Sequence, residues 1–126
     1  MRVTVDPRKT LGALGESLAS EHLRRRGYEI LERNYRTRWG ELDIIALDGT
    51  TIAFCEVKTR RGVGPGPTAL DAVGPRKRLR VRRMAASWLS ERSERPFARV
   101  LRFDAIGVIL DRSGRLLSLE HLEDAF

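Results

Sequence analysis

The feature that most constrains the fold of this chain is a pair of apolar, strand-like runs with charged residues inside them. The runs cover residues 40–46 and 54–58, and Asp48-Gly49 lies between them. Because Asp and Gly tolerate the positive φ values of a tight two-residue turn, this pattern predicts a β-hairpin. Charged groups inside such strands are costly to bury, so they require a counter-charge or a bound cation.

The turn also predicts which side chains share a face of the hairpin. With Asp48-Gly49 as the turn residues, Glu41 lies opposite Glu56. A four-residue loop would shift the pairing by two and set Asp43 opposite Glu56. Because side chains alternate between faces, both registers place the same set on one face: Glu41, Asp43, Phe54, Glu56 and Lys58.

Converging carboxylates on this face indicate a site for a divalent metal ion. Two carboxylates repel unless one is protonated or a cation lies between them, and oxygen ligands favour a hard ion such as Mg²⁺. We expect Asp43, Glu56 and the backbone carbonyl of Val57 to hold it. Lys58 reaches the same pocket, where its ammonium would hold the attacking water and offset charge on a phosphate. The combination predicts hydrolysis of a phosphodiester.

The order of Asp43 and then Glu56-Val57-Lys58 resembles the PD-(D/E)xK nuclease superfamily. Leu42 stands where that pattern has proline. Within the superfamily the chain looks like the YraN-type bacterial family, and the similarity runs from about residue 12 to residue 119. The segments that carry it are residues 27–28, 33–36, 40–43 and 56–58.

This resemblance implies roles for particular residues. Asp43, Glu56 and Lys58 correspond to the catalytic acid, acid and lysine. Glu16 corresponds to a first-helix glutamate that adds to catalysis and to the metal site in the similar archaeal Holliday junction resolvases. The resemblance further implies Mg²⁺ or Mn²⁺ as cofactor, branched or otherwise structured DNA as substrate, and a homodimer.

Composition limits the classes of protein to consider. The 126 residues suit one domain, 1–126, and the net charge of +7 with a pI of about 10.7 favours a polyanionic partner such as DNA, the alternative being a solvated basic surface. Cys55 is the single cysteine, which excludes an internal disulfide, and we expect it to pack as a small apolar group. His22 and His121 are isolated in the sequence and are expected in ordinary surface or core roles.

Nothing in the sequence predicts export or a membrane anchor. The first residues lack the apolar core of a signal peptide, and no apolar run approaches the length of a membrane span, so we expect a cytoplasmic protein. No small-molecule cofactor is expected.

The order of helical and strand-like patterns predicts a mixed α/β fold. A leucine stripe ending at Gly27 indicates a first helix, in which Gly12 and Gly15 would allow close approach to the sheet. Glu16 lies on their side, where it either reaches the metal pocket or remains a solvated acid. Strands are expected at 28–35, in the hairpin, at 99–110 and at 116–119, with a helix at 75–89. The resulting order αβββαββ is that of the restriction-endonuclease-like fold, with residues 1–10 and 120–126 expected to fray.

Basic residues gather after the hairpin. Residues 59–74 are rich in Gly and Pro and predict a mobile loop, and the first half of the next helix carries six bases within residues 76–83. Asp104, inside an apolar strand, is expected to pair with an arginine such as Arg102. The predicted nucleic-acid contacts are Arg36, Arg38, Arg60, Arg61, Arg76, Lys77, Arg80 and Arg83.

Three functions fit these patterns to different degrees. A metal-dependent DNA endonuclease accounts for both the charged hairpin and the basic surface. A nucleic-acid-binding module with a nuclease-like fold but no activity is the main alternative. An adaptor for an acidic protein would leave Asp43, Glu56 and Lys58 unexplained.

Overall fold

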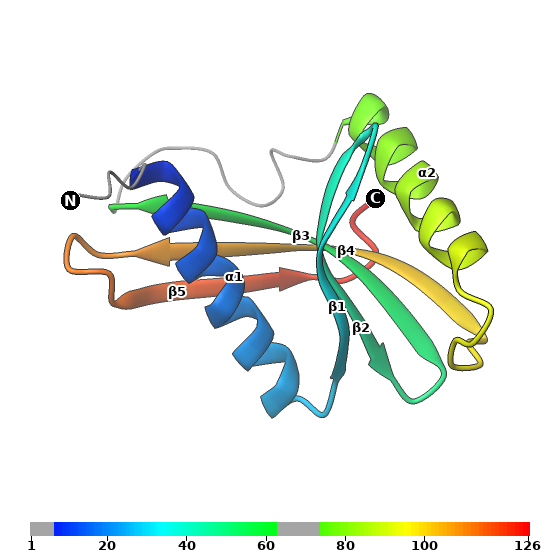
Figure 1. Cartoon of the computed structure of the whole chain (residues 1–126). Helices are drawn as coiled ribbons and strands as arrows, with labels where there is room; N and C mark the ends of the chain where they lie inside the picture. The colour runs from blue at the N-terminus through cyan, green and yellow to red at the C-terminus, as the bar shows by residue number, and fades with distance from the viewer. Residues whose placement is uncertain (1–6, 63–73) are drawn as a thin grey trace, which may run out of the picture.

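The helices and strands of the computed structural model follow one another in the predicted order αβββαββ (Figure 1). The structure describes residues 7–62 and 74–126. In these ranges the elements are α1 (Pro7–Arg25), β1 (Glu29–Thr37), β2 (Gly40–Asp48), β3 (Thr51–Arg61), α2 (Pro75–Glu91), β4 (Val100–Leu110) and β5 (Leu116–Leu122).

The strands form one mixed sheet in the order β1-β2-β3-β4-β5. Neighbouring strands are antiparallel except for β3 and β4, which are parallel over the whole of both strands. Parallel neighbours need a crossover connection, and α2 lies in the connection between these two strands. The predicted mixed sheet with a helical crossover is therefore confirmed.

Each face of the sheet carries its own apolar core. Val81, Met84 and Trp88 of α2 pack with Phe54 on one face, and Leu23 of α1 packs with strand residues on the other. Cys55 is fully buried in the α1 core, as predicted for a small apolar side chain. Because adjacent strand residues alternate between the two helices, the middle parts of β2, β3 and β4 are buried on both faces, whereas the edge strands β1 and β5 are mostly half-buried or exposed.

Gly15 sets the distance between α1 and the sheet. A Cβ at this position would collide with the side chain of Thr59 on β3, so only glycine allows the observed approach. Close approach is predicted for Gly12 as well, but that prediction is wrong, because a Cβ there would meet no atom within 4 Å.

The β2–β3 hairpin has the pairing of the second predicted register, but the predicted four-residue loop is wrong. Asp48 pairs with Thr51 and Ile44 with Cys55, a shift of two from the register of an Asp48-Gly49 turn, which leaves Gly49 and Thr50 as a two-residue turn. Gly49, with φ of 58°, occupies the first position of this turn.

Three segments of the chain are more ordered than predicted. Residues 7–10 belong to α1, although they lie in the range 1–10 that is expected to fray. β3 continues to Arg61 because it pairs with β4 as far as Leu110, so a loop beginning at residue 59 is wrong. The rest of that predicted loop, 63–73, lies outside the described residues, as do residues 1–6. At the C-terminus β5 runs to Leu122, and Phe126 is buried with its N–H directed at the carbonyl of Phe103, which contradicts fraying of 120–126.

Candidate metal centre

The candidate site lies where β1 and β2 interrupt their regular alternation. Leu42 packs in the α2 core, although Ile44, two residues later, packs in the α1 core. Asn34 lies at the same level of β1 and has a left-handed φ of 55°. Regular strands would place residues two apart on one face, so both strands change face here. Beyond this level β1 and β2 bend away from the rest of the sheet (Figure 1).

This bend opens β2 from β3 at Asp43. The ladder between the two strands ends at Ile44 and Cys55. The next interaction comes from a side chain, because the N–H of Val57 donates to Oδ2 of Asp43 over 2.7 Å. Asp43 thus takes the place of a main-chain partner and is fixed at the fork between the strands. Val57 contributes its N–H here, and its predicted carbonyl contact with a metal ion stays a prediction.

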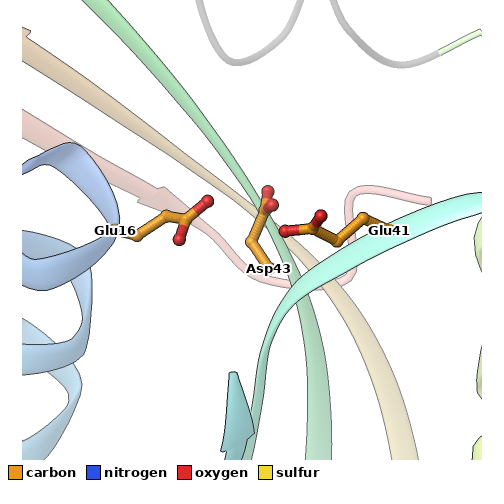
Figure 2. Close-up of side chains that lie close together, drawn as sticks. All are labelled: Glu16, Glu41 and Asp43. Atoms are coloured by element: carbon orange, nitrogen blue, oxygen red, sulfur yellow. The ribbon is translucent and has the colours of Figure 1, made fainter. Parts of the chain in front are cut away.

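Three carboxylates meet at the fork. Glu16 reaches it from α1, and Glu41 and Asp43 reach it from β2, with Asp43 between the two glutamates (Figure 2). One oxygen of each lies within 4.8 Å of the others. The structure therefore brings together two of the predicted ligands, Glu16 and Asp43, and adds Glu41.

Asn34 bridges the two glutamates of this cluster. Oriented by its hydrogen-bonding partners, its NH₂ group donates to Oε2 of Glu16 and to Oε1 of Glu41, each over 2.7 Å. Arginines approach the same acids from outside, Arg33 at 3.9 Å from Glu16 and Arg36 at 3.3 Å from Glu41. The donors offset part of the repulsion among the carboxylates.

Burial leaves this cluster short of compensating positive charge. Desolvation, with the negative charges of Glu56, Glu16 and Glu41, raises the pKa of Asp43 to about 8, and the hydrogen bond from Val57 only partly opposes this shift. Desolvation also raises the pKa of Glu16. Such a site takes up either protons or a cation, and its all-oxygen donor set fits a hard divalent ion such as Mg²⁺ or Mn²⁺.

Glu56 does not lie in the cluster, contrary to the predicted arrangement on one face. Its carboxylate is 3.2 Å from Nζ of Lys77 on α2. Glu56 follows Phe54 by two residues and keeps its α2-facing direction, whereas Asp43 has turned towards α1 at the change of face in β2. Glu56 is still near enough to raise the pKa of Asp43.

The predicted catalytic lysine, Lys58, is exposed on β3. It lies two residues after Glu56 and so projects from the same face of that strand. Its exposed side chain is accessible to an external phosphate, and its catalytic role stays a prediction.

Sequence reasoning misses two members of this site. It sets Glu41 on the shared face but not among the ligands, although the spacing of two from Asp43 in an apolar strand is a usable signal. It does not single out Asn34. Asparagine is unfavourable in strands and tolerates the left-handed region, so its presence between two strand-forming segments is the available indication of a bend.

Basic side chains surround the start of β2. Arg76, Arg80 and Arg83 are exposed on α2, and Arg80 lies beside Gly40. On the β1–β2 turn the guanidinium of Arg38 lies 4.6 Å from the ring centroid of Trp39. Two other predicted nucleic-acid contacts lie at the far end of β3, where Arg61 donates to the carbonyl of Arg112 and Arg60 to that of Gly62.

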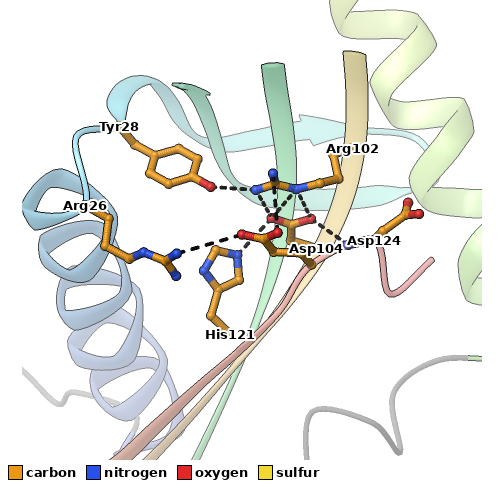
Figure 3. A network of polar contacts seen from close by, with 7 residues as sticks. Arg26, Tyr28, Arg102, Asp104, His121 and Asp124 are labelled. Atoms are coloured by element: carbon orange, nitrogen blue, oxygen red, sulfur yellow. Dashed lines mark hydrogen bonds and ion pairs between the residues drawn. The ribbon is translucent and has the colours of Figure 1, made fainter. Parts of the chain in front are cut away.

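A second group of charges is buried at the other end of α1, around Asp104 (Figure 3). Asp104 is completely buried and accepts from Nε of Arg102, from the N–H of Asp124, and from Nε2 of His121 at 2.8 Å if that nitrogen carries the proton. Burial alone would raise the pKa of Asp104, but these hydrogen bonds hold it below its ordinary value. The predicted pairing with Arg102 is confirmed.

The histidines are neighbours in space, although they are isolated in sequence. The ring centroids of His22 and His121 are 5.5 Å apart. Through His121 and Asp124 the Asp104 network ties the C-terminal segment to β4, which accounts for its order. None of the described helices is long and apolar enough to cross a membrane.

Comparison with known proteins finds relatives of this chain in several bacteria, and they share one family description. The family described as "Uncharacterised protein family UPF0102" matches residues 15–108, a span that contains the whole acidic cluster. A UPF0102 protein of Parafrankia sp. is 48% identical over 118 residues, which are 92% of this chain and 95% of that protein. One from Acidothermus cellulolyticus is 54% identical over 91 residues, 72% and 68% of the two chains. Another, from Pelotomaculum thermopropionicum, is 41% identical over 121 residues, 96% and 98%.

Proposed function

The chain belongs to the uncharacterised protein family UPF0102, and we propose that it is a divalent-metal-dependent endonuclease that hydrolyses phosphodiester bonds in DNA. One observation carries this proposal: Glu16, Glu41 and Asp43 converge within 4.8 Å at a fork in the sheet, where the exposed Arg36 lies 3.3 Å from Glu41. The acids match the preference of Mg²⁺ and Mn²⁺ for oxygen ligands, and the arginine matches a polyanionic substrate.

The residues of the fork are suited to hold such an ion. Glu16, Glu41 and Asp43 would supply carboxylate oxygens, and the Val57 N–H already fixes one oxygen of Asp43. When bound, the ion would supply Lewis-acid activation of the phosphodiester and of the attacking water. The burial that raises the pKa of Asp43 also limits water around the site, which strengthens its interactions with a cation.

Lys58 is the chain's own candidate for stabilising the reacting phosphate. Its side chain is exposed on β3, and it directly follows Val57, whose N–H holds Asp43 at the fork. A cation positioned where negative charge develops lowers the barrier of phosphoryl transfer. Lys58 is therefore assigned to transition-state stabilisation rather than to metal binding.

The basic surface supports DNA as the partner. Arg76, Arg80 and Arg83 project from α2, and Arg38 lies against Trp39 on the neighbouring turn. Contacts between such arginines and DNA phosphates contribute affinity without recognising the base sequence. Preference for branched DNA, action as a homodimer and a cytoplasmic location follow from the sequence and its resemblance to junction resolvases, and they belong to this proposal.

A binding module without activity is the second candidate, and one observation favours it. Glu56, expected to complete the metal site, is bound to Lys77 instead of to the cluster. If this pair is permanent, the fork lacks one of the acids that the resemblance assigns to the metal site.

Cleavage assays distinguish these candidates. Linear, flap and four-way DNA are incubated with the full chain in Mg²⁺, in Mn²⁺ and in chelator, with Asp43→Ala as the matched variant. The proposal expects cleavage that needs the metal and is lost in Asp43→Ala. Binding of all three DNA forms without cleavage in either metal would favour the inactive module.

A further inference from the structure

We propose that Lys77 couples nucleic-acid binding to completion of the metal site. In the chain alone its ammonium holds the Glu56 carboxylate apart from the cluster of Glu16, Glu41 and Asp43. Phosphates bound along α2 draw the ammonium away, and Glu56 is then free to join the cluster. This inference rests on the proposed function and adds a mode of regulation to it.

The position of Lys77 on α2 sets it apart from the other basic residues of the helix. Val81, Met84 and Trp88, which follow it by four, seven and eleven residues, form the buried stripe of α2. Residues at these spacings share one face of a helix, so Lys77 begins the face that packs on the sheet. Its side chain is 26% exposed, whereas Arg76 and Arg80 are exposed. Lys77 thus points mainly towards β3 rather than towards solvent.

Glu56 is the partner that this orientation selects. Its side chain is 15% exposed and lies 3.2 Å from Nζ of Lys77. Glu56 also directly precedes Val57, whose N–H holds Asp43, so the paired carboxylate is attached one residue from the acidic fork. A glutamate side chain has several rotatable bonds, and release from Lys77 leaves this one able to turn towards a cation at the fork.

Exchange of partners by Lys77 requires little net free energy. A partly buried ion pair gains from attraction about what it loses from desolvation, so replacing the carboxylate by a phosphate leaves a pair of the same kind. Arg80 follows Lys77 by three residues, so the two side chains are neighbours on the helix surface, and a phosphate that binds Arg80 comes close to the ammonium. Coupling between two binding sites is reciprocal. Bound DNA therefore raises the metal affinity by the same factor by which bound metal raises the DNA affinity.

Calorimetric titration of the full chain with Mn²⁺, without nucleic acid, tests the first half of this inference. Lys77→Met removes the ammonium and keeps the aliphatic length. Arg78→Met removes one positive charge from the exposed face of the same helix, at a residue not assigned to DNA binding, and serves as the matched control. We expect Lys77→Met to bind Mn²⁺ at least about fivefold more tightly than the wild type, the lower limit of ordinary coupling between sites. Arg78→Met and Lys77→Arg should resemble the wild type.

Fluorescence anisotropy with a labelled phosphorothioate duplex, which resists hydrolysis, tests the second half. Mn²⁺ should strengthen duplex binding by the wild type and by Arg78→Met, and by a smaller factor in Lys77→Met. Melting temperatures in chelator establish that each variant is folded. Equal Mn²⁺ affinity of the wild type and Lys77→Met would overturn the coupling and leave the metal centre intact. Absence of Mn²⁺ binding in both would overturn the metal centre itself and the coupling with it.

Discussion

The N–H of Val57 donates to Oδ2 of Asp43 over 2.7 Å at the point where main-chain pairing between β2 and β3 ends. A carboxylate thereby replaces a main-chain acceptor at the opening of the sheet. This hydrogen bond fixes Asp43 between Glu16 and Glu41, where burial and the neighbouring charges raise its pKa to about 8. The arrangement disfavours the ionised carboxylate in the metal-free chain and favours it when a cation is present.

The raised pKa of Asp43 makes metal-free stability depend on pH. The ordinary value is 3.8, so between about pH 4 and 8 the folded chain holds a proton that the unfolded chain has released. The stabilising contribution of Asp43 is complete below this window and decreases as pH rises through it. Asp43→Asn should remove this contribution to the slope while its amide oxygen still accepts from Val57.

Thermal melts in chelator at pH 5 and pH 8 measure the effect. We expect Asp43→Asn to melt above the wild type at pH 8, with a smaller difference at pH 5, and to lose Mn²⁺ binding. A variant that melts below the wild type at pH 8 would show that the charged carboxylate stabilises the metal-free fold.

Asn34 is expected to stabilise the metal-free cluster through its bridge between Glu16 and Glu41. Asn34→Gly keeps the left-handed backbone without strain and removes only the amide, so it should lower the melting temperature in chelator. Added Mn²⁺ should recover part of the difference, because a cation also relieves the repulsion. Asn34→Asp adds a fourth carboxylate and should have a larger effect in chelator. Unchanged melting of both variants would contradict the bridge.

Gly15 offers a direct test of how α1 packs on β3. Gly15→Ala places a methyl group against Thr59, which should destabilise the fold by about 1–3 kcal/mol. Gly12→Ala is the matched control, since its Cβ meets no atom within 4 Å and alanine favours helix. Denaturant unfolding of the two variants should therefore give changes of opposite sign. Equal effects of the two substitutions would contradict the close contact between Gly15 of α1 and Thr59 of β3.

The exposed arginines of α2 should contribute to DNA affinity without sequence preference. Replacing Arg76, Arg80 and Arg83 by Ala should weaken binding to all duplexes alike and reduce the salt slope by about 0.9 for each phosphate that is no longer neutralised. Anisotropy titrations at several salt concentrations provide the slope. A triple variant with the affinity and slope of the parent would assign these arginines to ordinary solvated surface.

The sequence predicts the fold because its strongest signals are local. Asp48-Gly49 between apolar runs specifies a hairpin, and Pro75 marks the start of α2. The register stays open to a shift of two, because Gly49 could be the second residue of an Asp48-Gly49 turn or, as observed, the first residue of a Gly49-Thr50 turn. Turn chemistry alone does not decide between these two positions.

The site is predictable only in part, because it depends on a bend in two strands. Period-two reasoning assumes that a strand keeps its faces, and β2 changes face at Asp43. That change separates Asp43 from Glu56 and brings Glu41 to Glu16. Lys77 lies among basic residues in the sequence, and it is therefore predicted to contact phosphates. Its helical spacing to Val81 and Met84 nevertheless places it on the side of α2 that faces the core.

Single-turnover cleavage by the wild type and by Lys58→Met is the decisive test of the proposed nuclease activity. The substitution keeps the aliphatic length and removes the charge of an exposed residue, so folding, Mn²⁺ binding and most DNA affinity should persist. We predict metal-dependent cleavage by the wild type and a rate roughly 10²-fold lower in the variant, the scale of losing one preorganised electrostatic donor. A wild type that cleaves no DNA in Mg²⁺ or Mn²⁺, together with a variant whose melting temperature falls sharply, would contradict nuclease activity and assign Lys58 to a structural network.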